Sequence, residues 1–314
     1  MAEPALAADP ALLAEVRAGM ERAQKELPPK FFYDERGSEL FEAITRLPEY
    51  YLTRAEAALL ARRMPEWMPA LGPAALVELG AGSAVKTSLI LDAMEGAEVY
   101  VPVDVSAEFL DDTAARVRAA YPALEVRPVA ADFTAAFALP PLPPPVLHAF
   151  LGSTVGNFAP DDAIALLRAT RLRMGSRDRF LMGVDLRKDP ARIEAAYNDA
   201  AGVTAEFNRN MLRVLNALAG ADFDVDAFAH RAFYDRAEHR IEMHLVPDAP
   251  QTVTVPGAGR WTVAPGESIR TEISCKHDRG SIDALFAAAG LRVERWEDDG
   301  DFALVLASAV VGLP

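Results

Sequence analysis

The sequence predicts an α/β protein in which a parallel sheet with crossover helices is interrupted by an inserted α+β subdomain. From Ala74 to the strand-like RFLMGVDL, short apolar runs alternate with helical segments, as is typical of a parallel sheet. The first apolar run, ALVEL, ends in a glycine-rich turn, GAGS. Between about residues 190 and 276 the alternation stops, and a long helical run precedes several strand-like segments. We interpret that part as the insertion.

The segments before the sheet are predicted to be helices. One begins at Asp9 or Pro10 and runs through ALLAEVRAGMERA. The prolines of LPPKFF form a turn, after which SELFEAIT reads as a second helix with Ser38 as its N-cap. A third helix covers about residues 54–70.

The remaining elements follow in chain order. In the alternating region the predicted strands are ALVEL, VYVPVD, LEVRPVAADF, VLHAF and RFLMGVDL, and the helices are VKTSLILDAM, FLDDTAARVRAAY and residues 161–172. The insertion has a helical run broken near Gly202 and Gly220, followed by the strands HRIEMHLV, QTVTV, RWTV and SIRTEISC. The chain closes with a helix stopped by Gly290 and a hairpin formed by RVERW and FALVLASAV.

Composition excludes several classes of function. The formal net charge of −14 disfavours nucleic acid and anionic membranes as partners, because both require a basic surface. The single cysteine, Cys275, allows no internal disulfide, which fits a reducing compartment. The N-terminus lacks the basic region of a secretory signal, and the uncharged run 302–314 is too short to span a bilayer. We expect a soluble, cytoplasmic protein, a monomer with a small-molecule substrate.

The glycine-rich turn after the first strand is where an open parallel sheet usually binds a nucleotide-like ligand. The dinucleotide fingerprint GxGxxG needs a small third residue where this chain has Val85. A phosphate loop is suggested by Lys86 and Thr87, but Val85 also replaces the glycine that this motif needs before its lysine. S-adenosylmethionine carries a sulfonium and no phosphate, so it does not need either motif.

Acids at successive strand ends favour such a nucleoside-type cofactor. Asp104 ends the second strand, 22 residues after Gly82, where a carboxylate can accept hydrogen bonds from a ribose diol. Asp132 and Phe133 end the third strand, where they can bind an adenine amino group and cover the base. Methyl transfer is the leading hypothesis for the use of this cofactor.

Six stretches of the chain together resemble one known family. FFYDERGSELFEAITRLPEYY, VELGAGS, FLGSTVGN, AYNDAAGVTAEFNRN, RIEM and TEISCK are similar to the histidine N-alpha-methyltransferases of ergothioneine biosynthesis. The resemblance implies a Rossmann-like class I methyltransferase sheet and S-adenosylmethionine as cofactor. It also implies a cofactor-binding domain from residues 55–190 and 277–314, and a substrate-binding domain from 1–54 and 191–276. In that family the alpha-amine of histidine is methylated three times to give hercynine.

The resemblance also implies two sets of site residues. The cofactor set is Tyr50, Gly80, Lys86, Asp104, Asp132 and Phe133. The substrate set is Tyr33, Phe41, Tyr50, Gly152, Asn157, Tyr197, Met243, Glu272 and Ser274. No metal ligands are expected, because His239 and His244 are five residues apart and lack the spacing of a zinc-binding HExxH motif.

Within the substrate set, the resemblance implies that Asn157 and Tyr33 are catalytic. Asn157 would orient the amine, with Gly152 beside it. A tyrosine hydroxyl would pass the proton to water. The tyrosines close over the amino-acid end, with Phe41 nearby.

Met243, Glu272 and Ser274 would surround the side chain. Glu272 can accept from one ring N–H of imidazole, and Ser274 can donate to or accept from the other nitrogen.

Three alternatives remain open at this point. A methyltransferase of the same fold could act on another small amine, such as tryptophan or a modified histidine, although Met243 and Glu272 favour imidazole. Some letters depart from the family pattern, namely Leu52, Ala81, Ala84 and Val85, and leave room for a shifted substrate preference. A nicotinamide oxidoreductase is disfavoured by the missing third glycine, and a non-enzymatic binding module by the clustered polar motifs.

Overall fold

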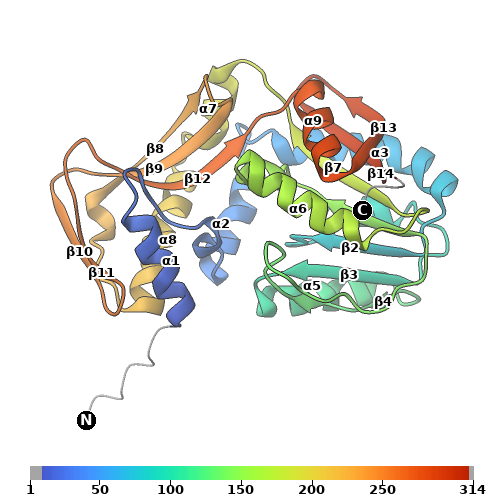
Figure 1. Ribbon diagram of the computed structural model, residues 1–314, viewed down its shortest axis with the longest axis horizontal. Helices are drawn as coiled ribbons and strands as arrows, with labels where there is room; N and C mark the ends of the chain where they lie inside the picture. The colour runs from blue at the N-terminus through green and yellow to red at the C-terminus, as the bar shows by residue number, and fades with distance from the viewer. Residues whose placement is uncertain (1–8, 311–314) are drawn as a thin grey trace, which may run out of the picture. The chain divides into compact units, whose positions relative to one another are not determined.

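The computed structural model describes residues 9–310, which form two compact units (Figure 1). The large unit comprises residues 51–188 and 274–310, and the small unit comprises residues 9–50 and 189–273. The chain therefore passes between the units after Tyr50, Lys188 and Ile273. No helix within residues 9–310 combines the length and apolar character needed to cross a membrane.

The large unit is built on an eight-stranded sheet. Five strands run parallel in the order β7, β6, β2, β3, β4, with the short β5 also paired to β3. The hairpin of β13 and β14 continues the sheet beyond β7, to which β14 pairs in the antiparallel direction. The bounds are β2 (Ala75–Leu79), β3 (Val99–Asp104), β4 (Glu125–Val126), β5 (Val129–Ala130), β6 (Val146–Phe150), β7 (Arg179–Asp185), β13 (Leu291–Asp298) and β14 (Phe302–Ala309).

Helices cover both faces of this sheet, which explains why its central strands are apolar on both sides. Residues of α6 (Pro160–Arg173) and α9 (Arg279–Ala289) share one core with alternate residues of β2, β3, β6, β7 and β14; Figure 1 shows α6 crossing in front of the sheet. The other helices of this unit are α3 (Leu52–Leu71), α4 (Thr87–Leu91) and α5 (Ala107–Ala120).

The strand order changes direction at β2, which has β3 on one side and β6 on the other. Crevices outside the carboxyl ends of the strands at such a point are the usual ligand sites of open α/β sheets. The carboxyl end of β2 leads into Gly80, and that of β6 leads into Gly152 and the 3₁₀ turn η2 (Thr154–Asn157). Two of the predicted motifs therefore start at this point of the sheet.

The small unit has a four-stranded sheet in the order β1 (Lys25–Glu26), β12 (Ile269–Cys275), β9 (Arg240–Pro247) and β8 (Phe228–Asp235). The last two residues of β12 belong to the large unit. A separate hairpin joins β10 (Gln251–Val255) and β11 (Gly259–Val263). The helices are α1 (Pro10–Met20), η1 (Pro29–Phe32), α2 (Glu35–Thr45), α7 (Pro190–Tyr197), α8 (Val203–Ala219) and η3 (Val225–Ala227).

Several predicted elements differ in detail. Ser38 is wrong as an N-cap, because α2 begins at Glu35 and Asp34 caps it by accepting a hydrogen bond from Gly37 N at 2.7 Å. The third strand is split into β4 and β5 around Pro128, which has no N–H to donate to a sheet ladder. Asp132 and Phe133 consequently follow a strand that ends at Ala130.

Two further differences concern lengths and missed strands. The helix expected over VKTSLILDAM is reduced to the five residues of α4, because residues 85–86 belong to the turn before it and residues 92–94 lie beyond its C-terminal end. The strands β1 and β8 were not predicted. β1 has only two residues, and the exposed positions of β8 alternate irregularly with its buried ones.

Candidate active site

The glycine turn brings backbone and an aromatic ring together at the end of β2. Gly80 has φ +67° and Gly82 has φ +49°, which are left-handed conformations that favour glycine. A Cβ atom added at Gly80 would lie 3.5 Å from the ring of Phe133. Phe133 also packs edge-on against Phe150, with ring centroids 5.7 Å apart. Thus two members of the predicted cofactor set lie side by side.

The acids of the cofactor set lie near the neighbouring strand ends. Asp104, the last residue of β3, accepts a hydrogen bond from Gly82 N at 3.1 Å, so its carboxylate lies directly beside the turn. Asp132 accepts from Thr134 N at 2.9 Å. Both carboxylates are partly exposed and retain lone pairs for a ligand.

Lys86 forms an ion pair with a buried carboxylate that is not among the predicted site residues. Its ammonium donates to Glu56 of α3, whose side chain is fully buried. The Glu56 carboxylate also accepts from Gly152 N, at 2.8 and 3.0 Å to its two oxygens. A Cβ atom at Gly152 would be 3.5 Å from Lys86 Nζ. Glu56 therefore fixes the lysine of the turn and the start of the FLGSTVGN segment together.

These charges fit an S-adenosyl nucleoside better than a phosphate. The lysine that suggested a phosphate loop is neutralised by Glu56, while Asp104 and Asp132 add negative charge nearby. Carboxylates can accept from ribose hydroxyls and favour a cationic sulfonium, whereas they repel phosphate.

Glu78 of β2 is a second buried acid in the large unit. Its carboxyl accepts from Thr87 Oγ1 and Tyr100 Oη, each at 2.7 Å. Burial raises the pKa of Glu78 to about 7 from the usual 4.5, against these two hydrogen bonds, which lower it. These hydrogen bonds link β2, β3 and α4.

The FLGSTVGN and TEISCK motifs pack against each other in the large unit. A Cβ atom added at Gly156 would lie 2.7 Å from the carbonyl oxygen of Cys275 and 3.3 Å from Ser274 Oγ. The absence of a side chain at Gly156 therefore lets η2 lie directly on the end of β12. The adjacent Asn157 is partly exposed, and its side-chain amide has no hydrogen bond with any residue of the described range 9–310.

In the small unit, the predicted aromatic residues form one chain of edge-on contacts. The ring centroids are 5.9 Å apart for Tyr33 and Phe41, 6.4 Å for Phe41 and Tyr50, and 6.3 Å for Tyr50 and Tyr197. Phe207 of α8 packs on both Tyr33 and Phe41 and extends this aromatic cluster. Rings from α2, α7, α8 and the segments beside them thus converge, although they are far apart in the sequence.

Met243 and Glu272 lie on neighbouring strands of the small-unit sheet, β9 and β12. Met243 is 1% exposed, whereas Glu272 is half-buried. Ser274 is also buried, so the polar side of TEISCK does not face bulk water there.

Sequence reasoning missed a group of buried charges near the carboxyl end of β7: Asp185, Lys188 and Lys276, joined by Tyr51. A lysine that follows a strand, or a second tyrosine in PEYY, gives no signal in a single sequence. Only their burial together distinguishes them from surface residues.

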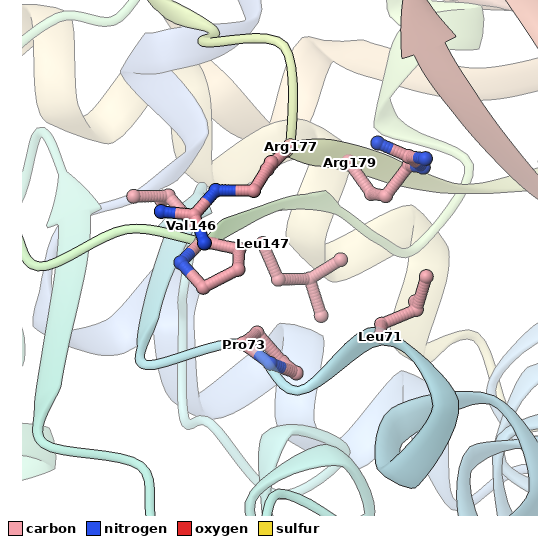
Figure 2. A pocket seen from close by; sticks show the side chains of 7 residues that line it. Leu71, Pro73, Val146, Leu147, Arg177 and Arg179 are labelled. Atoms are coloured by element: carbon pink, nitrogen blue, oxygen red, sulfur yellow. The ribbon is translucent and has the colours of Figure 1, made fainter.

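A small hollow in the large unit lies elsewhere. Leu71, Pro73, Pro145, Val146, Leu147, Arg177 and Arg179 line it (Figure 2). These residues surround the amino ends of β6 and β7. The carboxyl-end motifs described above contribute nothing to it, so we do not assign it to the cofactor.

Comparison with known structures confirms the predicted class I methyltransferase fold. A S-adenosylmethionine-dependent methyltransferase from Clostridium acetobutylicum superimposes with a TM-score of 0.50 at 12% identity, covering 87% of this chain and 98% of that one. The PH0226 protein from Pyrococcus horikoshii gives a TM-score of 0.52 at 16% identity, covering 88% of this chain and 100% of the other. At these identities the likeness concerns the fold alone.

Sequence comparison is more specific. Residues 12–309 match the family described as histidine-specific, SAM-dependent methyltransferases. The histidine N-alpha-methyltransferase of Mycolicibacterium smegmatis is 46% identical over 96% of this chain and 97% of the relative. The enzyme of the same name from Mycobacterium tuberculosis is also 46% identical, over 95% of each chain. The 4-dimethylallyltryptophan N-methyltransferase of Epichloe festucae is more distant, at 28% identity over 90% of each. The family resemblance and the cofactor predicted from the motifs are confirmed, and the chain belongs to the histidine-specific, S-adenosylmethionine-dependent methyltransferase family.

Proposed function

We propose that this chain methylates the alpha-amine of L-histidine three times to form hercynine, as a step in ergothioneine biosynthesis. The observation that carries the proposal is the packing of FLGSTVGN on TEISCK at Gly156. It brings together the segments of Asn157, whose amide has no partner in the described range, and Ser274, whose hydroxyl is buried. The first group suits an amine and the second an imidazole nitrogen.

The cofactor supplies a methyl group on a sulfonium when bound. We propose that Gly80 and Phe133 border its adenosine, that Asp104 accepts from the ribose, and that Lys86 and Tyr50 lie toward its amino-acid part. Asp132 would accept from the adenine amino group. The geometry of the glycine turn supports these roles, because Asp104 and Phe133 both lie against it.

The amine must be neutral to attack, although an alpha-amine is largely protonated near pH 7. We propose that the Asn157 carbonyl oxygen accepts from an amine N–H and so aims the nitrogen lone pair. Gly152 lies in the same segment, tied down by Glu56. The aspartates of these motifs, Asp34 and Asp199, accept hydrogen bonds from backbone N–H groups at the starts of α2 and α8. We therefore assign the proton to a tyrosine hydroxyl, that of Tyr33, which would pass it to water. Alignment of the two reacting groups then supplies much of the rate.

The aromatic cluster of the small unit is proposed to contact the amino-acid end. Each added methyl removes one N–H donor and leaves a more apolar cationic ammonium. Faces of Tyr33, Tyr50 and Tyr197 stabilise such a cation through cation–π contact, and Phe41 packs against the rings of Tyr33 and Tyr50. The small unit would therefore supply the aromatic contacts to the amino-acid end of the substrate.

Side-chain selection is assigned to Met243, Glu272 and Ser274. Glu272 would accept from one ring N–H, and Ser274 would pair with the other nitrogen. A site that pairs both nitrogens rejects a side chain that lacks them, because its own polar groups would remain unpaired. An indole has one donor and no ring acceptor, so tryptophan fits this arrangement less well.

The proposal is tested with purified protein, S-adenosylmethionine and each of the twenty amino acids, followed by mass spectrometry. We expect one, two and three added methyl groups on histidine alone.

Glu272→Ala should lose histidine turnover while its affinity for S-adenosylmethionine stays within about twofold of wild type. Glu238→Ala, which removes an exposed carboxylate from the turn between β8 and β9, is the matched control and should behave as wild type. Methylation of another amino acid instead would overturn the assignment.

We further propose that the enzyme works as a monomer in the cytoplasm. The acidic charge and the single half-buried cysteine support a reducing, aqueous setting. Light scattering of the purified protein tests the monomer, and fluorescence of a tagged chain in cells tests the location.

A further inference from the structure

The function proposed above leaves a buried group of charged side chains in the large unit without a role. Asp185 ends β7 and is 0% exposed. Its carboxylate accepts from Lys276 at 2.8 Å, from Lys188, and from the Tyr51 hydroxyl at 2.9 Å to each oxygen. We refer to Asp185, Lys188, Lys276 and Tyr51 as the Asp185 cluster.

The fold brings Lys276 to this place through backbone pairing. His277 N donates to Asp185 O at 3.0 Å, and Arg187 N donates to His277 O at 2.8 Å. The chain after β12 therefore runs parallel to the end of β7, which buries the whole Lys276 side chain next to Asp185.

Burial of this ammonium is costly unless it is paired and hydrogen-bonded. Burial alone would raise the pKa of Asp185, but Lys276 and Lys188 outweigh it, and the pKa is lowered. The carboxylate thus stays ionised and keeps both lysines in place.

Lys276 has a second partner, which connects the cluster to the proposed substrate site. Its Nζ donates to Ser274 Oγ at 2.9 Å. An ammonium only donates hydrogen bonds, so the Ser274 oxygen must act as the acceptor and its own proton must point away from Lys276. Ser274 is 2% exposed, and within the described range 9–310 no residue accepts that proton. The hydroxyl is therefore set as a donor toward a ligand.

We infer that Lys276 is a positioning residue that fixes the Ser274 hydroxyl as a hydrogen-bond donor and thereby selects a substrate ring that offers an acceptor nitrogen. The inference rests on the proposed function, in which Ser274 faces the imidazole. Neutral imidazole has one acceptor and one donor nitrogen. With Ser274 fixed as the donor, the ring must present its acceptor there and its N–H to the other side, so one tautomer is bound. A five-membered ring without nitrogen leaves the buried hydroxyl unpaired.

The test compares kcat/KM for histidine with kcat/KM for 3-(3-thienyl)alanine, whose ring has no nitrogen. Lys276→Met frees the Ser274 hydroxyl to rotate, so the preference for histidine should fall about tenfold, as expected for one hydrogen bond to a buried polar group. KM for S-adenosylmethionine should stay unchanged. Lys276→Gln keeps an N–H donor and should retain part of the preference for histidine. If Lys276→Met does not fold, Lys276→Gln takes its place in the comparison.

Two controls separate positioning from stability. Lys188→Met removes the other ammonium of Asp185 without touching Ser274, so it should leave the preference intact even if the protein melts earlier. Ser274→Ala should lower the preference by itself, and adding Lys276→Met to it should cause no further loss. The inference would be overturned if Lys188→Met lowered the preference for histidine as much as Lys276→Met does. It would also be overturned if Lys276→Met lowered that preference equally in the wild-type and the Ser274→Ala backgrounds. If wild-type enzyme does not methylate histidine at all, the proposed function fails first, and this inference fails with it.

Discussion

Replacing Glu56 by glutamine should destabilise the large unit and weaken cofactor binding at once. Glu56 is fully buried, and its carboxylate joins the Lys86 ammonium to Gly152 N. Glutamine keeps one acceptor oxygen but replaces the other with an NH₂ group. Since Lys86 Nζ and Gly152 N are both donors, the NH₂ group faces a donor in place of an acceptor. The variant therefore leaves Lys86 without its counterion.

The size of the effect follows from the exposure of the two partners. Removing one member of a buried ion pair typically costs about 3–5 kcal/mol. Lys86 remains 23% exposed and can gain some water, so we expect the free energy of unfolding to fall by about 2–3 kcal/mol. Affinity for S-adenosylmethionine should fall by about tenfold, because Lys86 and the start of FLGSTVGN lose their common support.

Urea denaturation measures the first quantity, and titration calorimetry with S-adenosylmethionine measures the second. Glu66→Gln is the matched control, since Glu66 lies on the same helix but is 57% exposed. Adding Lys86→Met to Glu56→Gln removes the stranded charge, so the double variant should be more stable than Glu56→Gln alone. The reasoning is refuted if Glu56→Gln unfolds within about 0.5 kcal/mol of the control variant and binds the cofactor as tightly.

Three further predictions concern pH, packing and product distribution. Burial raises the pKa of Glu78 to about 7 from 4.5, so its stabilising contribution is complete below pH 4.5 and is lost as pH rises through 7. The side chain of Glu78→Gln cannot ionise. Between pH 4.5 and 8, the free energy of unfolding of this variant relative to wild type should therefore rise by about 3 kcal/mol in denaturation curves. Parallel pH profiles of the two proteins would contradict this. Gly156→Ala places a Cβ atom 2.7 Å from Cys275 O and should displace η2, lowering kcat by roughly a hundredfold in steady-state assays; wild-type kcat would show that the two motifs need not touch. Tyr33→Phe should shift products toward mono- and dimethylhistidine by mass spectrometry, and unchanged partitioning would remove Tyr33 from proton transfer.

Much of the fold could be predicted because its signals are local. The apolar runs that became β2, β3, β6 and β7 are buried on both faces, and such runs alternating with helices indicate a parallel sheet in any context. Local chemistry also identified Gly290 as the end of α9, where it adopts φ +78°. Where two local signals competed, the prediction was wrong: both Asp34 and Ser38 can cap a helix, and the structure uses Asp34.

The sequence by itself determined the α/β class, the glycine turn, the acids near the strand ends and the motifs that mark the family. Only the tertiary structure decided which charges are buried and with whom. Glu56 contacts Gly152 across 96 residues of chain, and Asp185 contacts Tyr51 across 134. A carboxylate or an ammonium looks the same in a sequence whether it is solvated or buried, and its energy differs only once a partner from a distant segment replaces water. For that reason the residues that hold the site together, Glu56, Asp185 and Lys276, emerged from the fold, whereas the residues proposed to touch the ligands could be recognised beforehand.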